Sequence, residues 1–417
     1  MEYFLVGIMG SGMRALANLL LKMGHKISGS DVKKSFYIKD KLDSKIKLYE
    51  LKKTPINNKY IYILGNSFTS GYIASKLKKN NINFYLYPVF IEQLDFITKI
   101  AVCGSHGKTT TVKMVEEMAV MTSLVGDGSA NFQNEREFVY EACEYKDTFL
   151  HYFPDILITL NVDYDHTDYF KDETAYKKSF LKFYTQAKVN IFNYDDSFLK
   201  ENYEGYSFSL FDDKAYLYAS IIKKAKGYLV DVKKPFRKTF QTAFYSVGDI
   251  YSFLSILVLY SLLNKNIDEL KNRINLFKMP DRRFNLTSVF DKHIVLDYAH
   301  HPSQITSLYD RLSYQFKDYK KYIIYEGHTL KRSLDFLDEF KNSLSLFDEV
   351  FLFKLFSSNR ERNSFKTRKY YRLMPYKRYN KNVINKLKKE TNFVLVLAGA
   401  GNIDKLYPKL IAKLKNK

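Results

Sequence analysis

Short apolar runs alternate with amphipathic stretches over the first hundred residues of the chain. The pattern predicts strands at 3–8, 26–29 and 60–64 and a helix at 13–23. A strand, a helix and a second strand in succession are typical of a parallel sheet with helices on its faces. A Rossmann-like α/β domain is therefore expected at the start of the chain.

The same pattern begins again twice. An apolar run at 100–103 leads into glycines and a helical stretch at 109–120, and strand-like runs follow at 138–140 and 156–160. The strands of the third part are expected at 293–296, 322–325, 349–353 and 393–397. Because each restart needs a sheet of its own, three α/β domains are predicted, with the boundaries 1–97, 98–280 and 281–417.

An apolar run at 250–263 is the longest in the chain. It is shorter than the roughly 20 residues of a membrane-spanning helix, so a buried helix is expected there. The first residues lack the basic stretch and cleavage site of a signal peptide, and two cysteines cannot form a disulfide framework. The hydrophobic fraction of 46% excludes general disorder. We expect a soluble cytoplasmic protein with no membrane insertion.

The net charge of +21, from 66 Lys and Arg against 45 Asp and Glu, suits an anionic partner. The lysines are scattered along the whole chain, which favours a compositional bias or phosphorylated substrates over a nucleic-acid-binding stripe. The basic, tyrosine-rich stretch 366–389 could bind RNA through charge and stacking, but a solvated helix and loop explains it as well. No nucleic-acid partner is expected.

A first glycine loop joins the first strand to the first helix. Glycines allow a tight turn that brings the backbone close to a diphosphate at the helix N-terminus. Asp31 ends the next strand, where an acidic side chain would meet a ribose hydroxyl. The order G-x-x-G-x-G differs from the usual dinucleotide pattern, so a nicotinamide-dependent oxidoreductase and a plain turn remain alternatives. The candidate binding residues are Gly7, Gly10, Ser11, Gly12, Met13 and Asp31.

A second glycine loop lies between the strand at 100–103 and the helix at 109–120. In such a loop the backbone N–H groups bind phosphate oxygens, Lys108 supplies positive charge to the β- and γ-phosphates, and a threonine hydroxyl can bind Mg²⁺. The spacing is shorter than in the usual Walker motif. The predicted phosphate-binding residues are Gly104, Ser105, His106, Gly107, Lys108, Thr109 and Thr110.

Together the two loops and several later motifs resemble the Mur ligases, and among them the members that add L-alanine. The motifs follow the family's order over nearly the whole chain. They are the two glycine loops, Ser28 to Asp31, Glu141 to Glu144, Asn161 to His166, Arg282 to Phe284, Asp297 to Pro302, Gly327-His328 with Arg332, Asn359 to Glu361, and Gly399 to Gly401.

This resemblance implies three domains: a Rossmann-like UDP-binding domain, a central P-loop ATPase-like domain and a C-terminal Rossmann-like domain. It implies an ATP-dependent ligase of peptidoglycan precursor synthesis. The carboxylate of UDP-N-acetylmuramic acid would be activated as an acyl phosphate and joined to L-alanine, with Mg²⁺ as the metal.

The resemblance also implies roles for particular residues. Lys108, Glu141 and His166 would be catalytic, and Thr109, Glu141 and His166 would hold metal ions. Arg283 and Asp297 would contact ATP, in addition to the second glycine loop. The amino acid would be bound by His300, His328 and Arg332.

Some positions depart from the family pattern. Asp249-Ile250-Tyr251 stands where His-Asn usually helps to bind adenine, so adenine recognition is open. Leu64 to Ser67 resembles a recycling ligase that adds a whole murein peptide, and this enzyme remains an alternative. The choice among alanine, serine and glycine is open as well.

Overall fold

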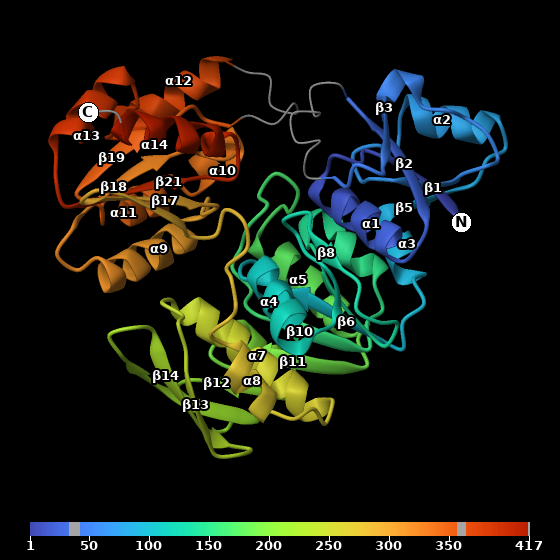
Figure 1. The fold of residues 1–417 in the computed structure, drawn as a ribbon, viewed down its shortest axis with the longest axis horizontal. Helices are drawn as coiled ribbons and strands as arrows, with labels where there is room; N and C mark the ends of the chain where they lie inside the picture. Colours follow the sequence, from blue (N-terminus) through green and yellow to red (C-terminus); the bar gives the residue numbers. More distant parts are fainter. Residues whose placement is uncertain (33–41, 357–363, 416–417) are drawn as a thin grey trace. The chain divides into compact units, whose positions relative to one another are not determined.

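The computed structural model describes residues 1–32, 42–356 and 364–415. The motif at 359–361 lies outside these ranges. The chain forms two compact units (Figure 1). The first contains Met1–Tyr164, Glu173–Ala243 and Asp249–Phe277, and the second contains Asp165–Asp172, Phe244–Gly248 and Lys278–Lys417.

A five-stranded parallel sheet begins the first unit. It confirms the strands expected at 3–8, 26–29 and 60–64 and the helix expected at 13–23. The strand order is β3 (Lys47–Glu50), β2 (Lys26–Asp31), β1 (Glu2–Val6), β4 (Ile61–Leu64) and β5 (Phe84–Leu86). The helices are α1 (Ser11–Lys22), α2 (Tyr72–Lys79) and α3 (Tyr87–Glu92).

A ten-stranded sheet forms the rest of the first unit. Its strands pair in parallel from β13 to β7, while β14, β15 and β8 are antiparallel to their neighbours. The order is β15 (Lys238–Gln241), β14 (Tyr228–Lys234), β13 (Leu217–Lys223), β12 (Tyr206–Ser209), β11 (Val189–Asn193), β10 (Ile156–Thr159), β6 (Thr98–Cys103), β9 (Glu137–Glu141), β7 (Thr122–Leu124) and β8 (Ala130–Asn131). The helices are α4 (Lys108–Met114), α5 (Glu173–Tyr184), α6 (Ser197–Asn202), α7 (Val247–Leu262) and α8 (Asp268–Arg273).

Two helices of this part were expected from the sequence. The helical stretch at 109–120 is α4, whose last turn widens into a π-helix at Val115–Ala119. The apolar run at 250–263 forms α7, which is buried on almost every side. No helix in the described ranges has the length and apolar character that crossing a membrane requires.

The second unit is built on a six-stranded sheet with helices on both faces, and the four strands expected here are confirmed. The order is β16 (Asn285–Val289), β17 (Lys292–Asp297), β21 (Phe393–Ala398), β18 (Lys320–Tyr325), β19 (Glu349–Leu352) and β20 (Lys377–Arg378). Only β16 is antiparallel to its neighbour among these described strands. The helices are α9 (Pro302–Gln315), α10 (Leu330–Asp335), α11 (Leu337–Leu344), α12 (Ser364–Leu373), α13 (Lys381–Lys389) and α14 (Tyr407–Lys415).

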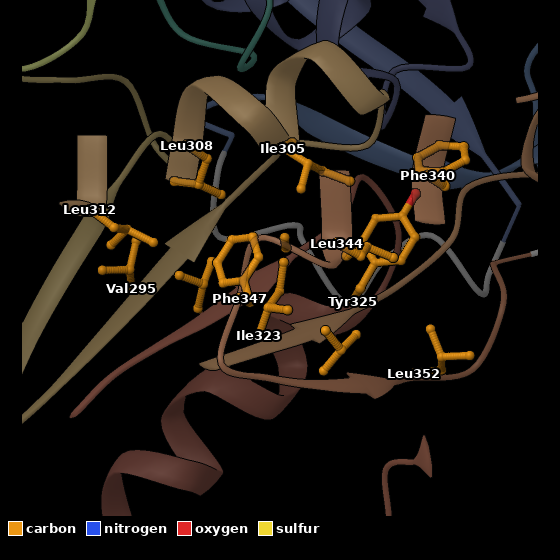
Figure 2. Close-up of a cluster of buried hydrophobic side chains, with 14 of the residues drawn as sticks. Val295, Ile305, Leu308, Leu312, Ile323, Tyr325, Phe340, Leu344, Phe347 and Leu352 are labelled. Atoms are coloured by element: carbon orange, nitrogen blue, oxygen red, sulfur yellow. The ribbon is translucent and has the colours of Figure 1, made fainter. Parts of the chain in front are cut away.

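Apolar side chains pack on the two faces of this sheet. On one face, Ile305 and Leu312 of α9 and Leu344 of α11 meet Val295 and Ile323 of the strands (Figure 2). On the other face, side chains of α13 and α14 cover the same strands. Buried apolar area of this kind is the main stabilising term of an α/β domain. The carboxyl ends of the parallel strands are thereby fixed at one edge of the sheet.

Candidate active site

The first glycine loop follows β1 and is tied to the end of β2. The Met9 N–H donates to Asp31 Oδ2 at 2.9 Å, and the Val32 N–H donates to Asp31 Oδ1 at 2.7 Å. Gly7 has φ of +86°, a conformation that favours glycine. The Asp31 carboxylate is buried and holds the loop in shape. Its expected contact with a ribose hydroxyl remains a prediction.

Arg14 on α1 also supports this loop, although the sequence analysis did not single it out. Its guanidinium is buried and donates to the Met9 carbonyl at 2.9 Å and to the Asp127 carbonyl at 3.0 Å. Asp127 lies in the turn before β8 of the ten-stranded sheet. Arg14 therefore links the first glycine loop to the central part of the first unit.

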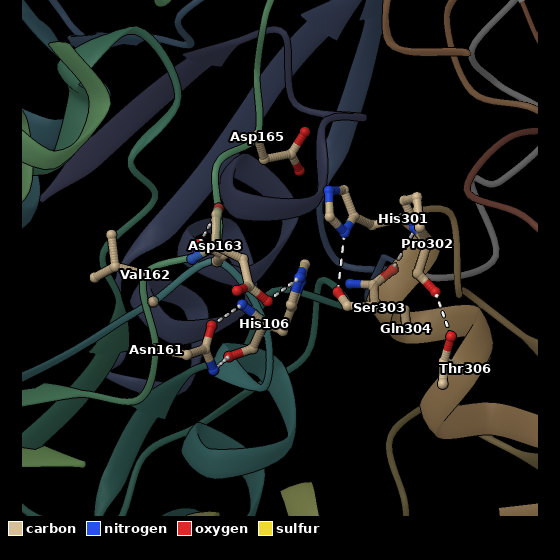
Figure 3. A network of polar contacts seen from close by, with 12 residues as sticks. His106, Asn161, Val162, Asp163, Asp165, His301, Pro302, Ser303, Gln304 and Thr306 are labelled. Atoms are coloured by element: carbon tan, nitrogen blue, oxygen red, sulfur yellow. Dashed lines mark hydrogen bonds and ion pairs between the residues drawn. The ribbon is translucent and has the colours of Figure 1, made fainter. Parts of the chain in front are cut away.

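The second glycine loop connects β6 to α4. Gly104 has φ of +134° and Gly107 has φ of +87°, so the loop needs glycine at both positions. Asn161 binds the loop with its side chain, accepting from the His106 N–H at 2.9 Å and donating to the His106 carbonyl at 3.1 Å (Figure 3). The first N–H groups of α4 have no partner within the helix, so they can bind an anion.

Asp163 holds the same loop from the other side. Its N–H donates to Ser105 Oγ at 2.8 Å, and the Ser105 hydroxyl donates to the Asp163 carbonyl at 2.6 Å. Its carboxylate lies 3.2 Å from His106 Nε2 (Figure 3). Ser105 and His106 are therefore engaged within the protein through both their side chains and their backbone N–H groups, which leaves the N–H groups at the start of α4 for a phosphate.

Lys108 is the first residue of α4, and its ammonium group is held from two directions. It donates to Glu144 Oε2 at 2.9 Å and to the carbonyl oxygens of Gly104 and Ser105. Burial by itself would lower the pKa of Lys108, but the carboxylate of Glu144 outweighs it and the pKa is raised. Lys108 is thus a fixed cation at the loop. Glu144 belongs to one of the motifs, but the sequence did not predict that it forms an ion pair with Lys108.

Glu141 ends β9, which lies beside β6 in the sheet. Val102 pairs with Glu141 in register, so this carboxylate lies at the edge from which the second glycine loop leaves. The Gly126 N–H donates to Glu141 Oε1 at 2.6 Å. Carboxylate and hydroxyl oxygens are ligands that Mg²⁺ prefers, which fits Glu141 and Thr109.

The described residues contain no group of three or more His, Cys, Asp or Glu side chains placed to hold a metal. A Mg²⁺ ion that enters with a nucleotide needs only one or two carboxylates, because phosphate oxygens and water complete its shell. The residues present at the second glycine loop therefore fit a nucleotide-bound Mg²⁺. They do not form a closed structural metal site.

A second polar cluster lies in the second unit and includes three of the expected residues. Arg332 is buried and donates from Nε and Nη2 to Asp165 Oδ1, both at 2.8 Å. Its Nη1 lies 3.1 Å from His328 Nδ1, and its Nη2 lies 3.5 Å from His166 Nδ1. Burial would raise the pKa of Asp165, but Arg332 and the nearby histidines hold it well below its usual range.

His300 lies beside this cluster. Its ring is 5.5 Å from the ring of His328, and its Nδ1 lies 2.9 Å from the Tyr298 carbonyl oxygen. A carbonyl can only accept, so Nδ1 carries the proton and Nε2 has a free lone pair in the neutral ring. Burial, followed by Arg332 and His328, lowers the pKa of His300 well below its ordinary value. His300 is therefore neutral at pH 7.

The two residues expected to contact ATP from the third part of the chain lie at the same end of the β16–β17 hairpin, with Arg283 before β16 and Asp297 at the end of β17. Asp297 accepts from the Phe284 N–H and the Ala299 N–H, both at 2.8 Å. The guanidinium of Arg283 lies over the Tyr298 ring at 5.1 Å. Asp297 thus shapes the turn that carries Arg283, and its own contact with a nucleotide remains a prediction.

Tyr251 is one of the residues that replace the family's usual His-Asn. Its hydroxyl donates to Asp195 Oδ2 at 2.9 Å. Burial and the Asp195 carboxylate raise the pKa of Tyr251. Asp195 also accepts from the Leu210 N–H at 2.7 Å, so this pair braces the end of β12. Tyr251, which stands near where the family usually has an asparagine, is thus hydrogen-bonded to Asp195.

Comparison with known proteins shows which folds this chain resembles. A sequence model of the Mur ligase family, catalytic domain, matches residues 2–88. The structure of UDP-N-acetylmuramate-alanine ligase MurC from Thermotoga maritima superposes with a TM-score of 0.77 at 19% identity, over 99% of each chain. A murein peptide ligase from Psychrobacter arcticus gives 0.71 at 19% identity, over 100% of this chain and 99% of that one. The ADP complex of MurF from Thermotoga maritima gives 0.63 at 15%, over 93% and 95%.

The chain has the three-domain fold of the Mur ligases. The resemblance that the motifs indicated is thus confirmed, and so is the predicted α/β fold class. The domain boundaries at 97 and 280 remain predictions.

The structure brings the expected site residues together in two groups. The first unit holds both glycine loops and Glu141. The second unit holds His166, Arg283, Asp297 and the three residues expected to bind the amino acid, His300, His328 and Arg332. The resemblance implies that Glu141 holds one metal ion and that His166 holds a second. In the structure its described contacts include Arg332, and the metal role remains a prediction.

The lowered pKa of His328 predicts how stability depends on pH. Burial and the Arg332 charge lower this pKa from 6.5 to about 4. The unfolded chain therefore binds a proton at a higher pH than the folded chain. His328 contributes fully to stability above about pH 6.5, and the contribution falls as the pH drops from 6.5 to 4, by up to about 3 kcal/mol.

We expect His328→Gln to flatten the loss of unfolding free energy between pH 6.5 and pH 4. His300 contributes in the same direction, so part of the slope should remain. The measurement is denaturant unfolding of both proteins from pH 4 to pH 8. Parallel curves for the two proteins would show that His328 does not titrate as the structure indicates.

Proposed function

We propose that this chain is an ATP-dependent ligase of peptidoglycan precursor synthesis. It would join the carboxylate of UDP-N-acetylmuramic acid to the amino group of L-alanine. The observation that carries the proposal is the second glycine loop, in which the fixed ammonium of Lys108 lies at the start of α4 beside two positive-φ glycines. The fold shared with the Mur ligases supports the same conclusion.

The first step would be attack of a carboxylate oxygen on the γ-phosphorus of ATP, with ADP as the leaving group. Both reactants are anions, so fixed positive charge lowers the barrier. Lys108 would bind the β- and γ-phosphates, and the N–H groups at the start of α4 would bind phosphate oxygens. Bound Mg²⁺, with Glu141 and Thr109 as protein ligands, would further neutralise the phosphates.

The second step would be attack of the amino nitrogen on the acyl carbon, with inorganic phosphate as the leaving group. The amino acid arrives mainly as an ammonium and must lose a proton before it attacks. His300, with its proton on Nδ1, would accept a hydrogen bond from the amino group through Nε2. Arg332 would bind the amino-acid carboxylate.

Two alternatives are separated by particular observations. A nicotinamide-dependent oxidoreductase would use the first glycine loop but would leave the Lys108–Glu144 pair and the second loop without a function. A ligase that adds a murein peptide shares the fold, as the Psychrobacter arcticus enzyme shows. The incoming acceptor therefore has to be decided by experiment.

The deciding experiment measures ADP formation with ATP, Mg²⁺ and UDP-N-acetylmuramic acid, adding L-alanine, L-serine, glycine or a murein tripeptide in turn. We expect ADP formation to require the UDP-sugar and to be fastest with L-alanine. A tripeptide preference would identify the recycling ligase. Absence of ADP with every acceptor would rule out the proposed activity, and binding of NAD(P)H would then favour the oxidoreductase.

A further inference from the structure

Among the residues that the structure describes, Asp165 is the acidic side chain that contacts Arg332 directly. The contact belongs entirely to the second unit, since the stretch Asp165–Asp172 and α10 both lie there. Lys331, next to Arg332, holds the same stretch by donating to the Thr167 carbonyl oxygen. The position of Asp165 relative to Arg332 is therefore fixed from two sides.

The hydrogen bonds of Asp165 are distributed unevenly over its two oxygens. Oδ1 accepts from Arg332 Nε and Nη2 at 2.8 Å and from the His166 N–H at 2.6 Å. Within the described part of the chain, these bonds all fall on Oδ1. An anionic carboxylate has acceptor capacity on both oxygens, so Oδ2 retains the capacity to accept from a donor outside the protein.

Arg332 is engaged in a complementary way. Its Nε and Nη2 bind Asp165 Oδ1, and its two terminal nitrogens also face imidazole nitrogens, with Nη1 3.1 Å from His328 Nδ1 and Nη2 3.5 Å from His166 Nδ1. A carboxylate binds the fork of two terminal nitrogens more strongly than a neutral ring does, because the hydrogen bonds are charge-assisted and paired. A substrate carboxylate can thus replace the imidazoles without displacing Asp165.

The charges of the Asp165–Arg332 pair cancel. The two side chains form a buried ion pair at 2.8 Å, one negative and one positive. A buried neutral pair has no preference for a simple anion, since a lone carboxylate would leave the site with excess negative charge. A zwitterion, whose two charges are close together, satisfies both members of the pair.

We propose that Asp165 is a specificity-determining residue that binds the ammonium group of a free α-amino acid while Arg332 binds its carboxylate. This deepens the proposed function and rests on it for the reaction. It names the acceptor class as a small zwitterionic amino acid. A peptide separates its amino group from its terminal carboxylate by several bonds more, so it cannot bridge adjacent charges in the same way.

The test compares L-alanine with propionate, which is the same molecule without the amino group. Binding to the full chain is measured by calorimetry, in the presence of UDP-N-acetylmuramic acid and a non-hydrolysable ATP analogue. Asp165→Asn should weaken the binding of L-alanine about tenfold to a hundredfold, because a charge-assisted hydrogen bond is lost. Propionate should bind the variant at least as tightly as it binds the wild type, because the negative charge beside Arg332 is gone.

Binding of L-alanine and binding of propionate are expected to change in different directions, which makes the result specific for a contact with the ammonium group. If the binding of both ligands becomes weaker, Asp165 only maintains the structure. If the binding of both becomes tighter, Asp165 only competes with the ligands for Arg332. Either outcome, or no change in either ligand, overturns the proposal. Asp172→Asn is the matched control, since it removes an exposed acidic group from the same stretch and should change the binding of neither ligand.

A second variant covers the case in which Asp165→Asn does not fold. Asp165→Glu keeps the charge that neutralises Arg332 but moves the carboxylate by one methylene, so L-alanine should weaken and propionate should not. Loss of both ligands in this folded variant contradicts the proposal. Because binding is measured directly, these results are independent of ADP formation. A chain that binds L-alanine through Asp165 but makes no ADP would retain this inference and lose the proposed reaction.

Discussion

Replacing Lys108 by methionine is expected to lower the rate of ADP formation by about two to three orders of magnitude. The side chain keeps its hydrocarbon length but loses the ammonium that would bind the β- and γ-phosphates. Affinity for the UDP-sugar should stay the same, because the first glycine loop is a separate site. The measurement is ADP formation at saturating UDP-sugar and amino acid, together with calorimetric binding of the UDP-sugar.

The same substitution removes the ion pair between Lys108 and the buried Glu144 carboxylate. Breaking a buried pair by removing one member typically costs about 3–5 kcal/mol, so the unfolding free energy of Lys108→Met should fall. The double variant Lys108→Met with Glu144→Gln removes both charges and should recover much of that stability. ADP formation should remain low. If the double variant regains ADP formation, the loss in the single variant came from damaged folding, and Lys108 does not act on phosphate.

The pattern of apolar residues was sufficient to predict the sheets. The strands at 100–103, 156–160 and 393–397 and the helix at 250–263 are buried on nearly all sides, so their composition is determined by the core rather than by function. The first glycine loop and the second could be located because a strand, a glycine turn and a helix follow each other in the sequence. These features are local, and local patterns can be read from a chain without its fold.

The partners of the functional side chains could not be predicted in the same way. Lys108 and Glu144 are 36 residues apart, and Arg332 and Asp165 are 167 residues apart. Such contacts depend on which strand edges the fold brings together. An acidic residue next to a motif histidine has no local signature, which is why Asp165 was passed over. Asp297 was identified from its motif, but its two hydrogen bonds from backbone N–H groups could not be predicted from that motif.

Gly126→Ala is expected to raise the Mg²⁺ concentration needed for half-maximal ADP formation by about tenfold or more. A methyl group at this position would lie 2.2 Å from Glu141 Oε1 and 2.4 Å from Oε2. The obstructing atoms are the end of a flexible side chain, so the carboxylate would swing away at little cost to the fold. Glu141 would also lose the hydrogen bond from the Gly126 N–H. A displaced ligand weakens metal binding by about 10- to 100-fold.

Two comparisons decide whether this effect acts through Glu141. Glu141→Gln should show a similar shift in Mg²⁺ requirement, and the double variant should be little worse than either single one, because both changes remove the same ligand. Gly248→Ala is the matched control, since its new methyl group would lie no closer than 3.8 Å to any neighbour and should leave the Mg²⁺ requirement unchanged. Additive shifts in the double variant would mean that Gly126 affects activity by another route. An unchanged requirement in Glu141→Gln would remove Glu141 from the metal site altogether.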